Sequence, residues 1–161
     1  MPVHNIQPIF DSHSQILILG SFPSVKSREG EFFYDHPQNR FWRVMAAVLE
    51  CPVPVTHEQK RVFLLSHGIA LWDVIASCEI SGSSDSSIKN AVPNDLSRII
   101  LHSNVKAVFC NGGTAFKFYE KYSRQSTGMP AMKLPSTSPA NAVFSIHKLS
   151  EEWRAILPYL L

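Results

Sequence analysis

Asn39 is the residue whose type and setting best suit chemistry, and it lies in the segment His36-Pro37-Gln38-Asn39-Arg40-Phe41-Trp42. A carboxamide can orient a water molecule through its carbonyl oxygen and offer N–H groups to a ligand, but it cannot act as a strong general base. Asn is also among the preferred N-cap residues, so Asn39 could simply begin the helix that follows. The residue types alone favour the cap, and they place Arg40 on a solvated helix face.

Aromatic rings and small polar side chains gather between Gly20 and Trp42, directly after the apolar run Ile16–Leu19. Open parallel sheets bind ligands at the carboxyl ends of their strands. A loop of this composition suits a flat ligand held by stacking and hydrogen bonds, such as a nucleobase. The three adjacent rings of Phe32–Tyr34 cannot all face inward easily, so at least one is expected to line a cavity. Core packing is the alternative for these rings, and a tight turn is the alternative for Gly20–Ser24.

Three further polar loops follow predicted strands, over Ser83–Lys89, Asn111–Thr114 and Leu134–Asn141. Hydroxyl and backbone N–H groups suit phosphate contacts, which position a protein on a duplex, and a helix N-terminus after Asn111 could hold a phosphate. The proline-rich loop is stiff enough to fill the gap left by an extruded base, although it could be an ordinary turn. Each loop is a weak signal, but four polar loops at one sheet edge form a stronger one.

Alternating apolar segments predict an α/β fold with three α/β/α layers around a central, mainly parallel four-stranded sheet, in one domain over residues 1–161. The predicted strands are Gln15–Leu19, Ile69–Ile75, Val105–Cys110 and Ala131–Leu134. Two predicted helices cover Asn39–Leu49 and Thr114–Tyr122. The other helices are a segment opened by the capping-box pattern Thr56-x-x-Gln59 and ending near Gly68, one capped by Asn94, and a last one capped by Ser150.

The 161 residues carry a net charge of only +2, with 45% apolar and 17% charged residues. A large basic arm is therefore excluded, although a local basic patch is not. No apolar run approaches the ~20 residues that span a bilayer, and the N-terminal segment lacks the regions of a signal peptide. Cys51, Cys78 and Cys110 show neither disulfide nor metal spacing. We expect a cytoplasmic monomer without metal, cofactor, membrane contact or obligate protein partner.

Together these motifs resemble the uracil-DNA glycosylase superfamily over nearly the whole chain. In its mismatch-specific uracil branch the first-strand motif is GINPG, and HPxNRFW follows at the spacing that separates Gly20 from His36 here. One departure is that Phe22 stands where that branch has its catalytic Asn. The pair GSFPS and LPSTSPAN is similar to the hypoxanthine-DNA glycosylase branch, also called DNA-deoxyinosine glycosylase, whose catalytic Asn is that of HPxNRFW. The cysteine count excludes the branches with a four-cysteine iron–sulfur cluster.

The resemblance implies a monofunctional glycosylase that hydrolyses the N-glycosidic bond of a flipped deaminated base in DNA, hypoxanthine foremost. It implies that Asn39 is catalytic, that Tyr34 lies under the flipped base and that Phe22 shapes the pocket floor. The remaining residues of the implied base pocket are Ser21, Pro23, Ser24, Ser27 and His36. The implied DNA contacts are Ser87, Gly112, Thr114, Pro135, Ser136, Thr137, Ser138 and Pro139.

Three alternatives stay open. Within the family, the chain could be a uracil-DNA glycosylase of the mismatch-specific type. The same fold could also serve as a nucleotide- or DNA-binding module that leaves no abasic site. A serine hydrolase using Ser21 or Ser24 with His36 or His147 is disfavoured, because the chain has no nucleophile-elbow motif.

Overall fold

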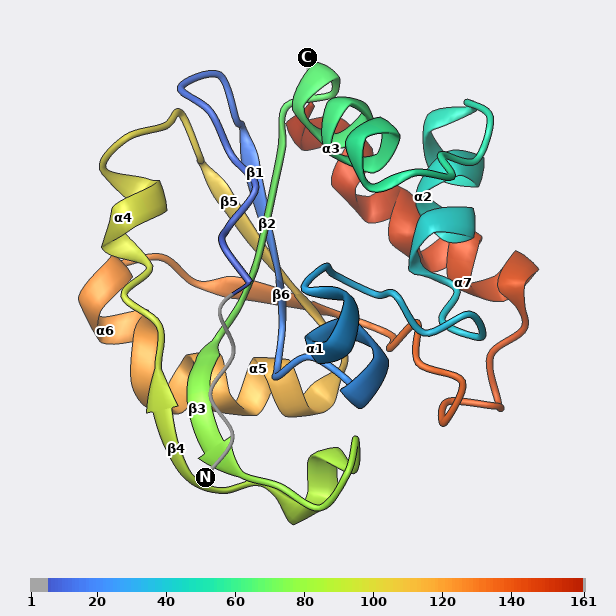
Figure 1. The fold of residues 1–161 in the computed structure, drawn as a ribbon. Helices are drawn as coiled ribbons and strands as arrows, with labels where there is room; N and C mark the ends of the chain where they lie inside the picture. The colour runs from blue at the N-terminus through green and yellow to red at the C-terminus, as the bar shows by residue number, and fades with distance from the viewer. Residues whose placement is uncertain (1–5, 161) are drawn as a thin grey trace.

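The computed structural model describes residues 6–160, and a parallel sheet of four strands lies at its centre (Figure 1). β1 (Ile16–Gly20) pairs with β2 (Ile69–Asp73) and with β5 (Ala107–Asn111), and β6 (Ala131–Leu134) pairs with the other side of β5. The strand order is therefore β2-β1-β5-β6, which confirms the predicted sheet. Residues 1–5, on which the expectation of no signal peptide partly rests, lie outside the described residues.

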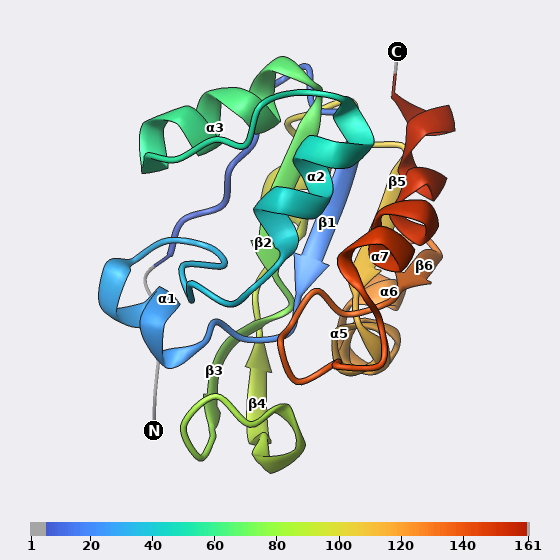
Figure 2. The same cartoon turned by 90° about the vertical axis from the view of Figure 1, so that its right-hand side faces the viewer.

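Helices cover both faces of the sheet and give the expected three layers (Figures 1 and 2). One layer contains α2 (Phe41–Leu49), α3 (His57–Ser66) and α7 (Ile146–Trp153). The 3-10 helix Arg154–Tyr159 continues α7 on the same side of the sheet (Figure 2). The other layer contains α4 (Ser97–Ile100), α5 (Gly113–Phe118) and α6 (Arg124–Thr127), with the π-helical turn Tyr119–Ser123 between the last two. Among the described helices, none combines the length and apolar character needed to cross a membrane.

The core is built on strands that are apolar along their length. β1 and β2 are buried at every position, as strands covered on both faces must be. From α2, Phe41 and Met45 are fully buried, and α7 contributes Leu149 and Trp153. Burying each such side chain stabilises the fold by about 1.5–3 kcal/mol. Because α2 and α7 also pack against each other, the start of α2, which Asn39 precedes, sits on a rigid support.

Three elements were missed in the sequence, and the predicted cap Asn94 is wrong. β3 (Ile75–Glu79) and β4 (Lys89–Pro93) form an antiparallel hairpin with an irregular register. α1 (Val25–Gly30) is a short helix inside the predicted loop after β1. Asn94 does not cap α4, because its side chain donates a hydrogen bond to the backbone carbonyl of Asp73 at 2.9 Å.

Of the other two predicted caps, one is confirmed and one is wrong. The capping box of Thr56 and Gln59 is confirmed at the start of α3. Ser150 is not the cap of the last helix, since it lies inside α7 and donates to the carbonyl of Ile146. The cap is Ser145, whose hydroxyl accepts a backbone N–H of the first turn. The last helix therefore begins earlier than predicted, and it reaches the loop that follows β6.

Candidate active site

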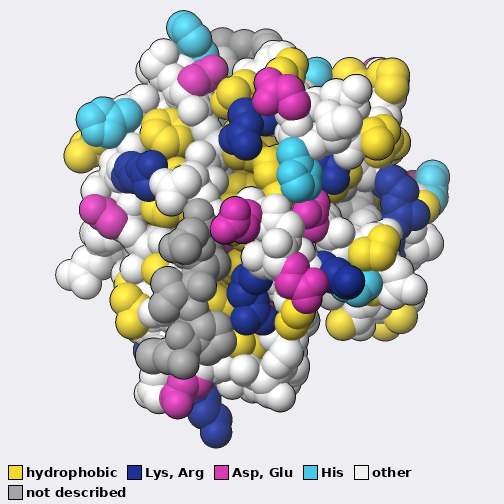
Figure 3. Space-filling model, viewed as in Figure 1, with side chains coloured by type: hydrophobic (Ala, Val, Ile, Leu, Met, Phe, Trp, Pro, Cys, Tyr) yellow, Lys and Arg dark blue, Asp and Glu magenta, His cyan; other side chains and the backbone are white. Residues whose placement is uncertain are grey.

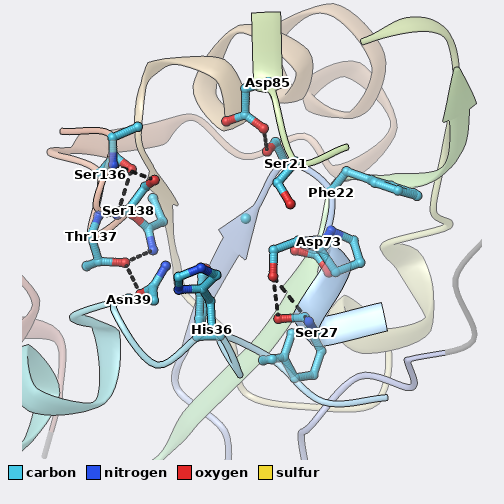
Figure 4. A pocket seen from close by; sticks show the side chains of 18 of the residues that line it. Ser21, Phe22, Ser27, His36, Asn39, Asp73, Asp85, Ser136, Thr137 and Ser138 are labelled. Atoms are coloured by element: carbon cyan, nitrogen blue, oxygen red, sulfur yellow. Dashed lines mark hydrogen bonds between the residues drawn. The ribbon is translucent and has the colours of Figure 1, made fainter. Parts of the chain in front are cut away.

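A cavity of about 290 Å³ opens at the carboxyl end of the sheet, where open parallel sheets bind ligands (Figure 4). Three strands end at it, with Gly20 of β1, Asp73 of β2 and Asn111 of β5. The other lining residues are Ser21, Phe22, Pro23, Ser24, Ser27, Phe33, Tyr34, His36, Asn39, Ser83, Asp85, Ser136, Thr137, Ser138, Pro139 and Ala140. The structure thus brings the predicted base-pocket residues together at one cavity. Its volume is near the lower limit of about 300 Å³ for small-molecule pockets.

A chain of hydrogen bonds from three separate segments holds Asn39. Its Oδ1 accepts the backbone N–H of Phe41 and the hydroxyl of Thr137, each at 2.9 Å. The Thr137 hydroxyl oxygen accepts in turn from Asn111 Nδ2 at 3.0 Å, and Asn111 Oδ1 accepts the Thr137 N–H at 3.0 Å. Because a backbone N–H can only donate, the oxygen of the Asn39 amide must face Phe41. The orientation of the amide is thereby fixed.

The Nδ2 group of Asn39 is consequently the part of the amide directed toward the cavity (Figure 4). The expectation that Oδ1 orients a water does not fit this arrangement, because two donors already occupy that oxygen. The N-cap of α2 is Arg40, so Asn39 lies one residue before the cap position that the sequence suggested for it. Its bond to the N–H of Phe41 is a local side-chain bond that braces the start of α2. One atom of the amide therefore braces the helix start while the other faces the cavity.

Arg40 fastens the loop 135–144 to the start of α2, so it is not a residue of a solvated helix face. Its backbone N–H donates to the carbonyl of Thr137 at 3.1 Å. Its guanidinium donates to four carbonyls of the same loop, those of Thr137, Ser138, Asn141 and Phe144. Charge-assisted hydrogen bonds are stronger than neutral ones. One side chain therefore holds the whole loop beside Asn39.

The loop Pro135–Pro139 has both buried and exposed residues. Thr137 is fully buried and bonds only within the protein, so the structure does not present it for the predicted DNA contact. Ser136 and Ser138 line the cavity, and Pro139 is exposed. Beyond Pro139, Val143 has 90% of its surface exposed, the most of any exposed large apolar residue in the described chain.

The loop after β1 forms the facing wall. Ser21 donates its hydroxyl to Asp85 Oδ1 at 2.9 Å. Phe22 is 7% exposed, and the guanidinium carbon of Arg28 lies 5.2 Å from its ring centroid. The Ser24 hydroxyl bonds to Ser27 and not to a histidine. Among the described residues, neither Ser21 nor Ser24 forms the serine–histidine pair that a serine hydrolase needs.

Two other predicted pocket residues mainly brace this loop. Ser27 is 2% exposed, and its hydroxyl oxygen accepts the backbone N–H of Asp35 at 3.0 Å. His36 lines the cavity, and its Nδ1 accepts the backbone N–H of Gln38 at 3.1 Å. Since Nδ1 is the acceptor, the proton of a neutral His36 lies on Nε2.

Tyr34 lies at the cavity with its ring stacked on Phe41, at 4.3 Å between centroids. Its φ of 53° is left-handed, which is uncommon for a bulky residue. Burial raises the pKa of the Tyr34 phenol, and the charge of Asp73 adds to this, so the hydroxyl stays protonated. Phe33 lines the same cavity but is 2% exposed, whereas Tyr34 keeps part of its surface accessible. Tyr34 is thus the ring better placed to meet a ligand.

Two carboxyl groups at the cavity were not among the predicted site residues. Asp73 is 4% exposed, and burial raises its pKa to about 7, with the negative charge of Asp85 adding to the effect. Asp85 lies in the 3-10 turn Asp85–Ser87 of an exposed loop, and partial desolvation of its carboxyl also raises its pKa, against the hydrogen bond from Ser21. Asp73 was detectable in principle, as the polar residue that ends an apolar strand.

The three other predicted DNA contacts lie away from the cavity lining. The Ser87 hydroxyl donates to the carbonyl of Ser84 at 2.6 Å and so braces its own loop. Gly112 is buried with a φ of 95°, and a Cβ there would lie 3.0 Å from the Cβ of Ser136. It therefore lets two loops approach closely and offers little surface. Thr114 is partly exposed at the start of α5.

Charge is mixed on the face shown in Figure 3, where Lys and Arg side chains alternate with Asp and Glu. No broad basic patch appears on that face, in keeping with the net charge of +2. Within residues 6–160, no group of three or more His, Cys, Asp or Glu side chains is arranged to hold a metal ion.

Comparison with known proteins agrees with the resemblance seen in the motifs. Residues 7–161 match the family model of the uracil DNA glycosylase superfamily. A protein of Methanosarcina acetivorans named hypoxanthine DNA glycosylase is 35% identical over 149 residues, covering 92% of this chain and 93% of its own length. A protein of the same name from Methanosarcina barkeri is 32% identical over 143 residues, covering 88% and 89%.

A solved structure agrees with the fold. A solution NMR structure from Methanosarcina acetivorans, described as a candidate uracil DNA glycosylase, is 32% identical with a TM-score of 0.80. The match covers 97% of this chain and 96% of that one. The sheet with its cavity at the carboxyl edge, the family match and these relatives lead to one assignment: the chain belongs to the uracil DNA glycosylase superfamily.

Proposed function

We propose that this protein is a monofunctional DNA glycosylase that hydrolyses the N-glycosidic bond of a flipped, deaminated base, with hypoxanthine as the preferred base. The observation that carries the proposal is the amide of Asn39, fixed at the wall of a base-sized cavity with Nδ2 directed inward. The family and the two relatives named hypoxanthine DNA glycosylase support the same reaction class. DNA is then the substrate.

The reaction needs positioned dipoles more than a strong base. Breaking the bond between C1′ and the base nitrogen gives the sugar oxocarbenium character and leaves negative charge on the base. A base turned out of its stack enters a cavity whose fixed donors replace water. Asn39 acts in this proposal as one such donor, through Nδ2, because its oxygen is occupied. The cationic sugar is electrophilic enough to take up a water that no strong base has activated.

The preference for hypoxanthine follows from ring area and hydrogen bonding. The rings of Tyr34 and Phe22 favour a large flat base, because stacking and apolar burial grow with ring area. Hypoxanthine offers a carbonyl oxygen beside a ring N–H, and backbone groups of Ser21–Ser24 can pair with both. Adenine has a donor in place of that oxygen, so a cavity N–H would lose its partner at about 1–3 kcal/mol. Uracil shares the hypoxanthine pattern and is the alternative.

The loop 135–144 is the proposed contact with the duplex. Its exposed apolar residues, Pro139 and Val143, suit the gap that an extruded base leaves in the stack. The hydroxyls of Ser136 and Ser138 lie at the cavity rim, where phosphates flanking the flipped nucleotide would pass. The hydrogen bonds from Arg40 hold the loop in place, so the loop can contact a base pair without changing its conformation.

Single-turnover cleavage of duplexes with one hypoxanthine, uracil or xanthine tests this proposal. Asn39→Ala should lose about 100-fold or more in rate, the scale of removing one positioned donor. Asn104→Ala, the same change at an exposed residue at the far end of the sheet, should cleave like the wild type. Near-normal cleavage by a folded Asn39→Ala would leave Asn39 only its role in bracing the start of α2. Binding without any abasic product would favour a non-catalytic module.

The base order is a separate outcome of the same assay. Hypoxanthine should be released faster than uracil when both are placed opposite the same partner base. If uracil is cut faster opposite every base, the preference is wrong, while the fold and the reaction class stand.

A further inference from the structure

Asp73 is a buried carboxyl group at the cavity that the proposed reaction has not used. It ends β2, and the side chain of Asn94 fixes that strand end through the backbone carbonyl of Asp73. The Asp73 carboxyl packs closely against Gly20. A Cβ at that position would lie 2.6 Å from Asp73 Oδ1 and 3.0 Å from the hydroxyl of Tyr34, so a larger residue would not fit there. Asp73 and Asn39 lie on different walls of the same cavity (Figure 4).

The groups around Asp73 favour its neutral form. Tyr34, from the loop before α2, faces it with a protonated hydroxyl. Ser21, from the end of β1, is neutral and is bonded to the carboxylate of Asp85 on the far loop. His36 lies at the cavity wall. Burial, and then the negative charge of Asp85, raise the pKa of Asp73 to about 7. A carboxylic acid thus persists near neutral pH, and unlike a carboxylate it can donate a proton.

The proposed reaction leaves a charge that such an acid can neutralise. When the bond between C1′ and a purine nitrogen breaks, its electron pair goes to the base, which leaves more readily if a proton reaches a ring nitrogen or the carbonyl oxygen. Asn39 can donate a hydrogen bond but cannot give up a proton under these conditions. General acid catalysis typically contributes about 10²–10⁴-fold in rate.

We propose that Asp73 is a second catalytic residue, a general acid that protonates the leaving base. This inference rests on the proposed glycosylase function. The Oδ–H bond of Asp73 breaks as the base accepts the proton, and the C1′–N bond breaks with its electrons moving to the base. A water oxygen then bonds to C1′, and the proton that the water releases restores the acid directly or through solvent. The sum is hydrolysis, with Asp73 unchanged.

The test is the pH dependence of single-turnover cleavage, measured with excess enzyme so that chemistry and not binding sets the rate. The wild-type rate should be level at low pH and fall about tenfold per unit above a pH near 7. Asp73→Asn keeps the shape but has no transferable proton, so it should lose about 100-fold and show no such decline. Asp95→Asn, at an exposed carboxyl outside the cavity, should match the wild type.

A second variant tests the same assignment without altering Asp73. Asp85→Asn removes a negative charge that raises the Asp73 pKa, so the decline in rate should begin at lower pH. This shift is informative even if Asp73→Asn fails to fold. An unshifted decline in Asp85→Asn, or a folded Asp73→Asn that keeps the wild-type rate or the wild-type decline, would overturn the assignment. No abasic product from the wild type at any pH would instead reject the proposed function itself.

Discussion

Replacing Thr137 by Val should damage catalysis by loosening Asn39, because the Thr137 hydroxyl bonds to the Asn39 and Asn111 side chains. Thr137 is fully buried, and its hydroxyl links Asn39 Oδ1 to Asn111 Nδ2. Val keeps the shape and removes the hydroxyl. Asn111 Nδ2 then loses its acceptor, at about 1–3 kcal/mol, while Asn39 keeps its bond to the Phe41 N–H and loses about 0.5–1.5 kcal/mol. The free energy of unfolding should fall by about 2–4 kcal/mol.

The expected loss of cleavage rate in Thr137→Val follows from the greater freedom of the Asn39 amide. With one of two restraints gone, Asn39 can rotate, and a loss of 1.4–2.8 kcal/mol in transition-state stabilisation corresponds to about 10- to 100-fold in rate. Urea unfolding and single-turnover cleavage measure the two effects separately. Thr137→Ser is the matched control, because it keeps the hydroxyl and loses one methyl group worth about 0.8 kcal/mol. If both variants cleave equally well, the hydroxyl does not position Asn39.

Four other predictions concern separate features. Because the Asp73 pKa is about 7 when folded and near 3.8 when unfolded, folding favours its protonated form. Wild-type stability measured by urea should therefore fall relative to Asp73→Asn by about 3 kcal/mol from pH 4 to pH 7, and parallel curves would contradict this. Arg40→Lys cannot reach four carbonyls, so it should speed proteolysis within residues 135–144 and lower cleavage of lesion DNA more than tenfold, and unchanged proteolysis would speak against the clamp. Borohydride should trap no protein–DNA adduct, since we assign no amine nucleophile, and an adduct lost in Lys133→Ala would overturn this. Binding should weaken only moderately with salt, and a slope equal to about eight or more phosphates would reveal an unrecognised basic surface.

The framework of the site was predictable because it depends on local patterns. Apolar runs of buried strands and the helical spacing after Asn39 are visible without tertiary contacts, and they indicated the sheet edge at which the cavity lies. The hairpin of β3 and β4 was missed because its register is irregular and because β4 ends in a proline, Pro93. Regular alternation, the usual signal of a paired strand, is weak there.

The supporting contacts of the site were not predictable, since they join distant parts of the chain. Thr137 and Arg40 appear in the sequence as a turn residue and a solvated cation, yet each is bonded to a segment about a hundred residues away. Asp73 appeared to be only the end of a strand. Its burial depends on the space beside Gly20 and on the ring of Tyr34, which arrive from two other segments.

The adjacency of Asn39 and Arg40 has a thermodynamic consequence. One residue faces the cavity and the next holds loop 135–144, and Thr137 is bonded to both. Any displacement of the loop by a duplex therefore acts on the Asn39 amide, and linkage requires the reverse effect to be of equal size. Binding of a nucleotide in the cavity should therefore raise the affinity of the loop for DNA. Insertion of the loop should raise the affinity of the cavity for that nucleotide by the same factor. Recognition of the lesion and distortion of the helix then form one cooperative binding event.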